Sequence, residues 1–294
     1  MTLRPQTVDA LDGVDPSYVE DLVRRAVAED LAGGVDVTST ATVPLHLLGT
    51  AAFVPREHGV VAGLGAALAV LDVVLGDELE IALVQRDGAQ VVRGEAVLEV
   101  TGPVRLLLTA ERTALNLLCH LSGVATLTRS WVDAVEGTGA RIRDTRKTTP
   151  GLRALEKAAV RAGGGVNHRM SLSDAALVKD NHVVAAGGVA AAFEAVRQAF
   201  PGVPVEVECD TVEQVVEVLA AGADLVLLDN MVPIQLRECV RLCRERGVIT
   251  EASGGLSLEI AHEIASTGVD YLAVGALTHS ARVLDVGVDL RTDS

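Results

Sequence analysis

Aromatic side chains are nearly missing from this chain of 294 residues, which contains three Phe, two Tyr and one Trp. Proteins that bind single-stranded nucleic acid usually stack the bases on aromatic rings, and few are available here. The formal net charge of −15 also repels a phosphate backbone. We therefore expect no nucleic-acid partner.

Long apolar runs are missing too. No run approaches the ~18 apolar residues that a membrane span requires, and the N-terminal stretch MTLRPQTVDALDGVDPSYVEDL has no apolar segment of the signal-peptide kind. The four cysteines show no C-x-x-C spacing; Cys239 and Cys243 lie one helical turn apart, which is a weak zinc signal, so reduced thiols are the better interpretation. We expect a cytoplasmic protein with no membrane partner.

Two catalytic motifs are also missing. The sequence contains no Walker A motif, which excludes an ordinary P-loop nucleotide hydrolase, and no Gly-x-Ser-x-Gly nucleophile elbow. The stretch AGLGAALAV at residues 62–70 resembles a dinucleotide fingerprint only faintly, because it lacks the third glycine and a surrounding β–α–β unit.

Lysine is the scarcest charged residue. Arginine supplies nearly all of the 25 basic residues, and the three lysines, Lys147, Lys157 and Lys179, fall within one 33-residue window. A lysine offers a compact ammonium group with rotatable donors, whereas arginine offers a planar fork. The clustering therefore suggests an anion site. The stripe Arg153, Lys157, Arg161 at i, i+4, i+8 is typical of a solvated helix face instead.

The chain has two regions with different patterns of predicted helices and strands. Residues 1–110 combine the helical SYVEDLVRRAVAEDL and AALAVLDVVLG with the strand-like TAAFVPR, LEIALVQR and AVLEVTG. We expect the last two strands to form a hairpin through Asp87-Gly88. This predicts a small α+β domain with an antiparallel sheet. Two helical segments follow, TAERTALNLLCHLSG and, resuming after it, VATLTRSWVDAVEG.

Strands and helices then alternate to the end of the chain. The predicted strands are RIRDT, ALVKD, VPVEVEC, DLVLLD, GVITEAS and YLAVGA, and their ends recur about 21–29 residues apart after a longer first interval. Each strand ends on a charged, polar or glycine residue. Only a closed barrel would bring all these ends to one rim, so we predict an α/β barrel of six to seven parallel strands.

Three clusters occupy this rim. The first is basic, and Lys147 and Lys179 stand out in it because they end apolar strands, where a charge needs a reason. Arginine suits carboxylates by bidentate pairing and lysine suits phosphate oxygens. The cluster therefore predicts that several anionic groups bind at once. Its members are Arg112, Arg146, Lys147, His168, Arg169 and Lys179.

The second cluster is acidic. Glu206 and Glu208 alternate with valines and so face one side of their strand, and Asp229 ends the next strand. Glu208 and Asp229 could hold Mg²⁺, directly or through water. The alternative is that these carboxylates only balance the arginines in ion pairs.

The third cluster is rich in glycine. EASGGLSLE and AVGALTHSA each follow a strand and lead into a helical turn, where backbone N–H groups can bind a phosphate. The GGG at residues 163–165 more simply ends the helix before it.

These segments together resemble a known family. ERTALNLLCHLSGVAT, DTRKTTPGLRALEKAAVRAGGGVNHRMSLSDAALVKDNH, VEVECD, LLDN, EASGG and DYLAVGALTHS closely resemble quinolinate phosphoribosyltransferase, also called nicotinate-nucleotide pyrophosphorylase (carboxylating). The resemblance extends over essentially the whole chain. It implies transfer of phosphoribosyl from 5-phosphoribosyl-1-pyrophosphate to quinolinate, giving nicotinate mononucleotide, pyrophosphate and CO₂ for de novo NAD synthesis.

The resemblance also implies an architecture. An N-terminal α+β sandwich would span residues 1–115 and be joined by the C-terminal tail 281–294, and an irregular α/β barrel would span 116–280. The family is built on homodimers, in which an arginine at the position of Arg112 enters the neighbouring subunit's site. Further assembly into a hexamer stays open.

Roles at the rim follow from the same resemblance. Arg146, His168 and Arg169, with Arg112 of the neighbouring subunit, would bind the two carboxylates of quinolinate. Phosphate and pyrophosphate would meet Lys147, Lys179 and His279, although Lys147 could instead brace Arg146. Glu208 and Asp229 would organise Mg²⁺ and the ribose hydroxyls. The 5-phosphate would be held by Ser253, Gly254, Gly275 and Ala276, and Thr145 and Gly255 would also belong to the substrate-binding residues.

Two other functions compete with this interpretation. A related phosphoribosyltransferase of the same fold could use another acceptor such as nicotinate, but an acceptor with one carboxylate needs fewer arginines. A phosphosugar-binding sensor would not need both a carboxylate pair and a lysine pair at a leaving group. Both are less favoured than the quinolinate reaction.

Overall fold

The computed structural model describes residues 3–292. By their contacts the residues group into two compact units. The first contains residues 1–127, 149–164 and 280–294, and the second contains residues 128–148 and 165–279. The predicted boundary lay at 115/116, and residues 149–164 group with the first unit rather than with the strands that precede and follow them.

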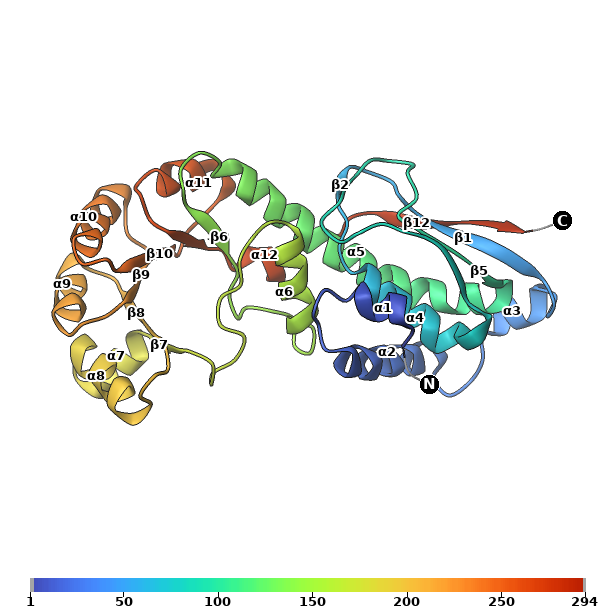
Figure 1. The fold of residues 1–294 in the computed structure, drawn as a ribbon, viewed down its shortest axis with the longest axis horizontal. Helices are drawn as coiled ribbons and strands as arrows, with labels where there is room; N and C mark the ends of the chain where they lie inside the picture. The colour runs from blue at the N-terminus through green and yellow to red at the C-terminus, as the bar shows by residue number, and fades with distance from the viewer. Residues whose placement is uncertain (1–2, 293–294) are drawn as a thin grey trace. The chain divides into compact units, whose positions relative to one another are not determined.

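The first unit is built on a four-stranded antiparallel sheet of order β12-β1-β5-β3. Its strands are β12 (Val286–Thr292), β1 (Leu48–Pro55), β5 (Leu98–Pro103) and β3 (Glu80–Val84), and a small ladder joins β2 (Gly59–Val60) to β4 (Gln90–Val91). Helices α1 (Pro5–Asp9), α2 (Pro16–Leu31), α3 (Val37–Thr42), α4 (Leu64–Leu75) and the 3₁₀ turn η1 (Gly76–Glu78) complete it. Helices α1 and α2 both pack on α4 (Figure 1).

The predicted turn at Asp87-Gly88 has a different function from the one expected. β3 and β5 pair in antiparallel fashion, but residues 85–97 connect them, and β4 lies within that connection. The Asp87 carboxylate instead accepts the N–H groups of Gly63 (2.7 Å) and Leu64 (3.1 Å), which begin α4. An Asp-Gly pair was interpreted as a hairpin signal, whereas here its side chain satisfies the free donors of a helix start.

The two predicted helical segments around residue 123 form one helix. α5 runs unbroken from Val104 to Ala134. Gly123, which suggested an interruption, is needed because a Cβ there would lie 2.2 Å from the Arg282 carbonyl oxygen. A glycine inside a helix can thus mark a close backbone contact rather than an end.

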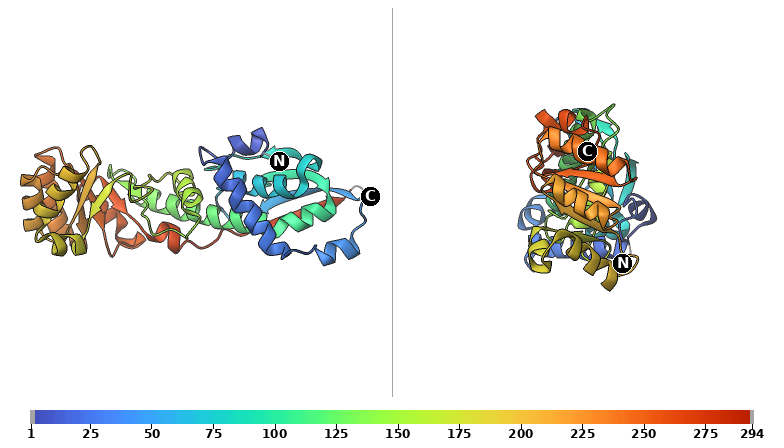
Figure 2. Two further views of the ribbon diagram at one scale, coloured as in Figure 1. Left: turned by 90° about the horizontal axis from the view of Figure 1, so that it is seen from below. Right: turned by 90° about the vertical axis from the view of Figure 1, so that its left-hand side faces the viewer.

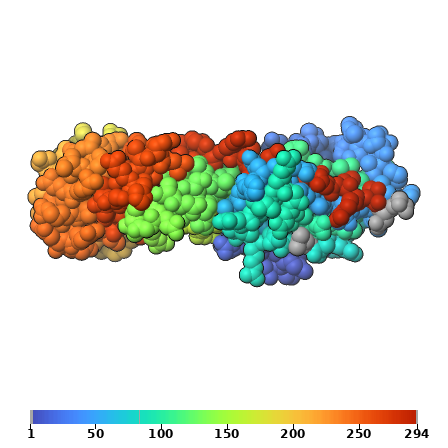
Figure 3. Space-filling model, turned by 90° about the horizontal axis from the view of Figure 1, so that it is seen from above, coloured from blue at the N-terminus to red at the C-terminus, as the bar shows by residue number. Residues whose placement is uncertain are grey.

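The C-terminal segment belongs to the first unit. β12 pairs with β1 in antiparallel register from Val286↔Pro55 to Thr292↔Gly49. In the space-filling view the red C-terminal residues lie among blue and teal residues of the N-terminal half (Figure 3). The last two residues of the predicted tail, 293–294, lie outside the described range.

Helix α6 (Arg153–Ala162) does not present the solvated basic stripe that its spacing suggested. Arg161 is exposed, but the side chains of Lys157 and its neighbour Glu156 are fully buried in the first unit. Glu156 accepts from Thr149 N–H at 3.0 Å and contacts His120 Nε2 at 2.8 Å. The helix ends at Gly163, as the GGG run predicted.

The second unit contains a six-stranded parallel sheet of order β6-β11-β10-β9-β8-β7. The strands are β6 (Arg141–Arg143), β7 (Ala176–Val178), β8 (Val205–Cys209), β9 (Leu225–Asp229), β10 (Ile249–Ser253) and β11 (Tyr271–Ala273), which are the six strands predicted. Beyond β6 a further parallel bridge joins Arg143 to Val166. Among the described residues no ladder joins β6 to β7, so the α/β arrangement is open at this edge.

Helices connect these strands and cover one face of the sheet (Figures 1 and 2). They are α7 (Asp180–Ala186), α8 (Val189–Ala199), α9 (Val212–Ala220), α10 (Pro233–Arg244) and α11 (Leu258–Ala265), and the short α12 (Ala276–His279) follows the last strand, β11. Thr211 and Gln214 form a capping box at the start of α9. The other face of the sheet carries the polar residues at and below the strand ends.

The described residues bear on two features, membrane-spanning helices and cysteine thiols. None of the helices between residues 3 and 292 is both long and apolar enough to cross a bilayer. All four cysteines have free thiols, and burial raises the pKa of Cys239 to about 11 and that of Cys243 to about 12.

Candidate active site

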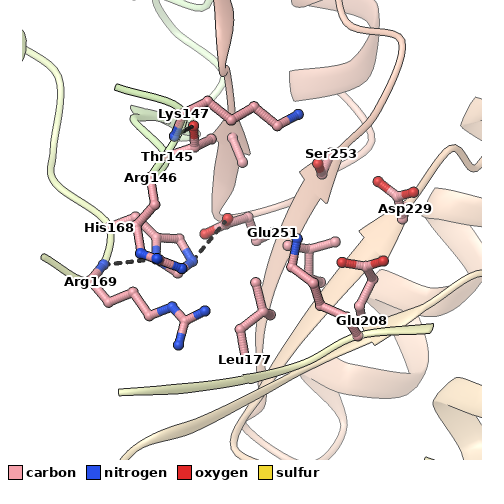
Figure 4. A pocket seen from close by; sticks show the side chains of 13 residues that line it. Thr145, Arg146, Lys147, His168, Arg169, Leu177, Glu208, Asp229, Glu251 and Ser253 are labelled. Carbon is pink, nitrogen blue, oxygen red and sulfur yellow. Dashed lines mark hydrogen bonds and ion pairs between the residues drawn. The ribbon is translucent and has the colours of Figure 1, made fainter. Parts of the chain in front are cut away.

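A cavity of about 370 Å³ opens at the carboxyl ends of the parallel strands (Figure 4). Most of the residues predicted for the rim line it, although they come from several separate segments of the chain. The lining residues are Thr145, Arg146, Lys147, His168, Arg169, Leu177, Lys179, Glu208, Leu227, Asp229, Glu251, Ser253 and Ala273.

One side of the cavity carries two guanidinium groups. Figure 4 shows Arg146 and Arg169 on the same side as His168, opposite Glu208 and Asp229. Arg169 Nη1 donates to the Ala175 carbonyl at 2.7 Å, which fixes the side chain. Burial, followed by the nearby charge of Arg146, lowers the pKa of Arg169. Two cations held this close together need anions between them, and a dicarboxylate meets that need.

His168 is bound through both ring nitrogens. Its Nδ1 accepts from the Arg169 N–H at 2.7 Å, so the ring proton lies on Nε2, which contacts Glu206 Oε2 at 2.6 Å. The backbone N–H of His168 donates to the buried Asp144 at 2.7 Å. The imidazole therefore orients the residue after it, and both of its nitrogens have protein partners.

The opposite side of the cavity is acidic. One carboxylate oxygen each from Glu208, Asp210 and Asp229 lies within 4.8 Å of the others. Burial, followed by the charge of Asp229, raises the pKa of Glu208. Hard oxygen ligands whose mutual repulsion a cation would relieve fit a divalent metal such as Mg²⁺. Asp210 was missed because it follows the end of β8 and is exposed.

Two lysines also line the cavity, Lys147 and Lys179. Figure 4 shows Lys147 at one end of the cavity, near Thr145 and Ser253. Thr145 Oγ1 accepts the Lys147 N–H at 3.0 Å, and Thr278 Oγ1 donates to the Lys147 carbonyl at 2.8 Å, so the backbone here is fixed while the ammonium side chain is exposed. Lys179 precedes α7, and its charge partly offsets the rise in the pKa of Glu208 that burial and Asp229 cause.

The glycine turns are shaped by close contacts. Gly254 has φ +82°, and a Cβ there would lie 2.3 Å from Asn230 Oδ1 and 2.9 Å from Asp229 Oδ1. Gly255 also has a positive φ, +58°, but faces open space. A second cavity of about 330 Å³ borders Ser253, Gly254 and Gly255. These turns therefore offer accessible backbone N–H groups beside the strand ends.

Gly275 holds the other turn close to Lys147. A Cβ at Gly275 would lie 2.9 Å from Lys147 Cδ and 3.2 Å from His279 Nε2. Ala276 begins α12 and His279 ends it. The structure thus brings Lys147, Gly275 and His279 together.

The floor of the cavity contains a charged group that the sequence analysis missed. Glu251 has a fully buried side chain, and its Oε2 accepts from Arg143 Nη1 at 2.6 Å. Arg143 also stacks over the Tyr271 ring, 4.8 Å from its centroid. His168, Glu206 and Glu251 have spacing that suits a metal. Arg143 pairs with Glu251 Oε2 and His168 Nε2 contacts Glu206 Oε2, so we interpret the cluster as buried ion pairs, in which Oε1 of each glutamate has no hydrogen-bond partner.

Two basic residues lie apart from the cavity. Arg112 is exposed on α5 in the first unit and does not line the cavity, and Lys157 is buried in the first unit. Of the three clustered lysines, the cavity therefore contains two.

Comparison with known proteins assigns the chain to a family. Models of the N-terminal and C-terminal domains of quinolinate phosphoribosyl transferase match residues 36–122 and 124–289. The carboxylating nicotinate-nucleotide pyrophosphorylase of Mycobacterium leprae is 56% identical over 273 residues, covering 92% of this chain and 96% of that protein. The probable carboxylating enzyme of Bacillus subtilis is 43% identical, covering 92% and 93%.

Solved structures agree with this assignment. The crystal structure of NadC from Streptococcus pyogenes matches with a TM-score of 0.91 and 37% identity, over 95% of this chain and 99% of that one. Both domains are thus matched, in sequence and in fold. The chain belongs to the quinolinate phosphoribosyltransferase family.

Proposed function

We propose that this cavity joins quinolinate to 5-phosphoribosyl-1-pyrophosphate and releases nicotinate mononucleotide, pyrophosphate and CO₂. The enzyme is a carboxylating nicotinate-nucleotide pyrophosphorylase of NAD synthesis. The observation that carries the assignment is the division of one cavity into a guanidinium side and a carboxylate side, with two lysines also in its lining. Nicotinate as acceptor is not favoured, because the relatives are named for the carboxylating reaction.

The guanidinium side binds the acceptor. Arg146 and Arg169 pair with the two carboxylates of quinolinate and hold its ring nitrogen in line with C1 of the ribose. His168 supports this side by fixing the Arg169 backbone. Alignment of the nitrogen with C1 supplies much of the rate enhancement that a displacement at this carbon needs.

The carboxylate side and the lysines bind the sugar pyrophosphate. Displacement of pyrophosphate builds positive charge on the ribose ring and negative charge on the leaving oxygens. Glu208 and Asp229 lie where they can hold the ribose hydroxyls, and Lys147, Lys179 and His279 neutralise phosphate oxygens. Gly254, Gly255, Gly275 and Ala276 present backbone N–H groups to the 5-phosphate.

Glu208 and Asp229, with Asp210 beside them, would hold Mg²⁺ directly or through water. When bound, the ion neutralises pyrophosphate oxygens as the C1–O bond breaks. Support for the site comes from the mutual spacing of the three carboxylates and the raised pKa of Glu208.

A second subunit completes the site in this proposal. Arg112 is exposed on α5, where its side chain is available to a neighbouring subunit's site, as the resemblance to the family implies. Mixing Arg112→Ala with Lys147→Ala would test this, because each variant alone lacks one half of every site. With random pairing about half of the dimers are mixed, and each mixed dimer has one complete site out of two. Recovery of about a quarter of the wild-type activity would therefore support a shared site. Its absence in exchanging dimers would contradict it. A hexamer and a cytoplasmic location stay predictions.

The first experiment is a coupled assay with quinolinate, the sugar pyrophosphate and Mg²⁺, with nicotinate as a parallel acceptor. Formation of nicotinate mononucleotide and CO₂ from quinolinate alone is expected. Turnover of nicotinate without CO₂ would instead assign the related transferase reaction, and binding of both substrates without turnover would indicate a sensor.

A further inference from the structure

The proposed reaction leaves one chemical requirement without a residue. When the carboxylate on ring carbon C2 departs as CO₂, its bonding electron pair stays on C2 and must receive a proton. None of the roles above supplies that proton. We propose, on the basis of the proposed function, that Glu251 is the acid that protonates C2.

Glu251 is placed for this task. It lies on β10 at the floor of the cavity, on the same side as His168, and its side chain has no exposed surface. Arg143 Nη1 donates to Oε2 at 2.6 Å, whereas Oε1 is buried without a hydrogen-bond partner. A buried carboxylate oxygen with no donor is costly when it is charged and acceptable when it carries a proton.

The surroundings favour the neutral acid. The groups that face Glu251 are Arg143 on β6 with Tyr271 behind it, Glu206 on β8, and His168. Two ionised glutamates would share Arg143 and the imidazole of His168. Burial, followed by the charge of Glu206, raises the pKa of Glu251 to about 7. The proton is held on Oε1, since Oε2 accepts from Arg143.

The other groups near the floor are less suited. Glu206 also has one oxygen, Oε1, without a hydrogen-bond partner, but unlike Glu251 it does not line the cavity. Both ring nitrogens of His168 contact protein groups, Glu206 Oε2 at 2.6 Å and the Arg169 N–H at 2.7 Å. Arginine does not release a proton in proteins. Lys147 and Lys179 are exposed at the rim, where they face the phosphates.

The step balances as follows. The bond from C2 to the carboxylate carbon breaks, its electron pair remains on C2 beside the positively charged ring nitrogen, and CO₂ leaves. The Oε1–H bond of Glu251 then breaks and its proton forms the C2–H bond. Glu251 is left as a carboxylate paired with Arg143, and it regains a proton from water before the next turnover.

Single-turnover quenching of Glu251→Gln tests the assignment. Gln keeps an acceptor for Arg143 but has no acidic proton. With quinolinate labelled in its 2-carboxylate, pyrophosphate release should stay within a few-fold of wild type. CO₂ release should slow by about 10²-fold or more, because the carbanion recaptures CO₂ until a proton reaches it. The N-ribosylated dicarboxylate should accumulate. Equal rates of CO₂ and pyrophosphate release in this variant would overturn the assignment.

Further variants keep the test decisive. Glu259→Gln, on the exposed surface of α11, is the matched control and should leave both rates unchanged. Calorimetric binding of quinolinate reports whether Glu251→Gln is folded; should it not fold, Glu251→Asp replaces it, with CO₂ release again expected to slow more than pyrophosphate release. In wild type the rate of CO₂ release should fall as pH rises above about 7. In Glu251→Gln this pH dependence should be absent. Failure of wild type to release pyrophosphate with quinolinate would sink the proposed function instead.

Discussion

Gly254 approaches the side chain of Asn230 so closely that a single added carbon would lie 2.3 Å from Asn230 Oδ1. Asn230 itself has φ +53°, and its amide donates to the Asp229 carboxylate. The turn after β10 and the end of β9 are therefore fitted to each other, and a change in one displaces the other.

Gly254→Ala should disturb this fit. The methyl group meets Asn230 and the positive φ disfavours a side chain, so Asp229 and the turn must shift. The KM for the sugar pyrophosphate should rise by about 10-fold or more, with little change in quinolinate binding. Gly255→Ala is the control, because it shares the positive φ but faces open space. Equal effects would indicate backbone strain rather than the Asn230 contact.

Arg169→Lys should weaken quinolinate selectively. A lysine keeps the charge but loses the planar fork and the bond to the Ala175 carbonyl. Loss of one charge-assisted pair costs about 1.5–3 kcal/mol, so the KM for quinolinate should rise about 10–100-fold. Steady-state kinetics with each substrate varied in turn measure this. Arg141→Lys, exposed at the start of β6, is the control. A matching rise for the sugar pyrophosphate would show that Arg169 does not serve the acceptor alone.

Glu208→Gln should raise the Mg²⁺ concentration needed for half-maximal activity, because one charged oxygen ligand is lost. Burial and Asp229 raise the pKa of Glu208, so protons compete with the ion at higher pH than for an ordinary carboxylate. In wild type the Mg²⁺ requirement should therefore increase as pH falls, and in the variant it should change less. A titration of Mg²⁺ at several pH values decides; an unchanged requirement in Glu208→Gln would remove Glu208 from the metal site.

Asp87 should make the first unit sensitive to pH. Burial raises its pKa to about 6, above the value of about 3.9 in an unfolded chain. Between these values the folded protein binds more protons, so its unfolding free energy falls as pH rises through about 4 to 6. Asp87→Asn lacks this term and should gain about 1–2 kcal/mol relative to wild type between pH 4.5 and 7.5. Melting temperatures of both proteins at the two pH values provide the test; parallel shifts would contradict it.

The residues at the rim of the sheet could be predicted from sequence because they lie in short contiguous runs at the ends of strands. Thr145, Arg146 and Lys147 follow β6, and Glu208 and Asp229 end or nearly end β8 and β9, so their meeting follows from the parallel sheet alone. The family resemblance added roles that spacing does not give. The residues that carry the family resemblance lie in the same short segments.

The positions of residues below the rim could not be predicted from strand ends. Glu251 lies two positions before Ser253 on the same side of its strand, just as Glu206 lies two positions before Glu208. This spacing is the sequence feature that could have predicted Glu251 as a residue of the cavity. Lys157 fitted a solvated stripe by spacing but is buried by packing that is distant in sequence. Asp87 and Gly123 were likewise interpreted from local rules, while their partners, Gly63 and Arg282, lie far along the chain.

The place of β12 beside β1 has a consequence for synthesis on the ribosome. Residues 48–55 emerge early, yet their strand lacks one neighbour until residues 286–292 have been translated. Gly123 likewise waits for the backbone at Arg282. During most of elongation the growing chain therefore exposes an unpaired strand edge, the kind of surface that promotes aggregation and that chaperones recognise. The second unit's strands lie wholly between residues 141 and 273, so its sheet can form before the first unit's sheet is finished.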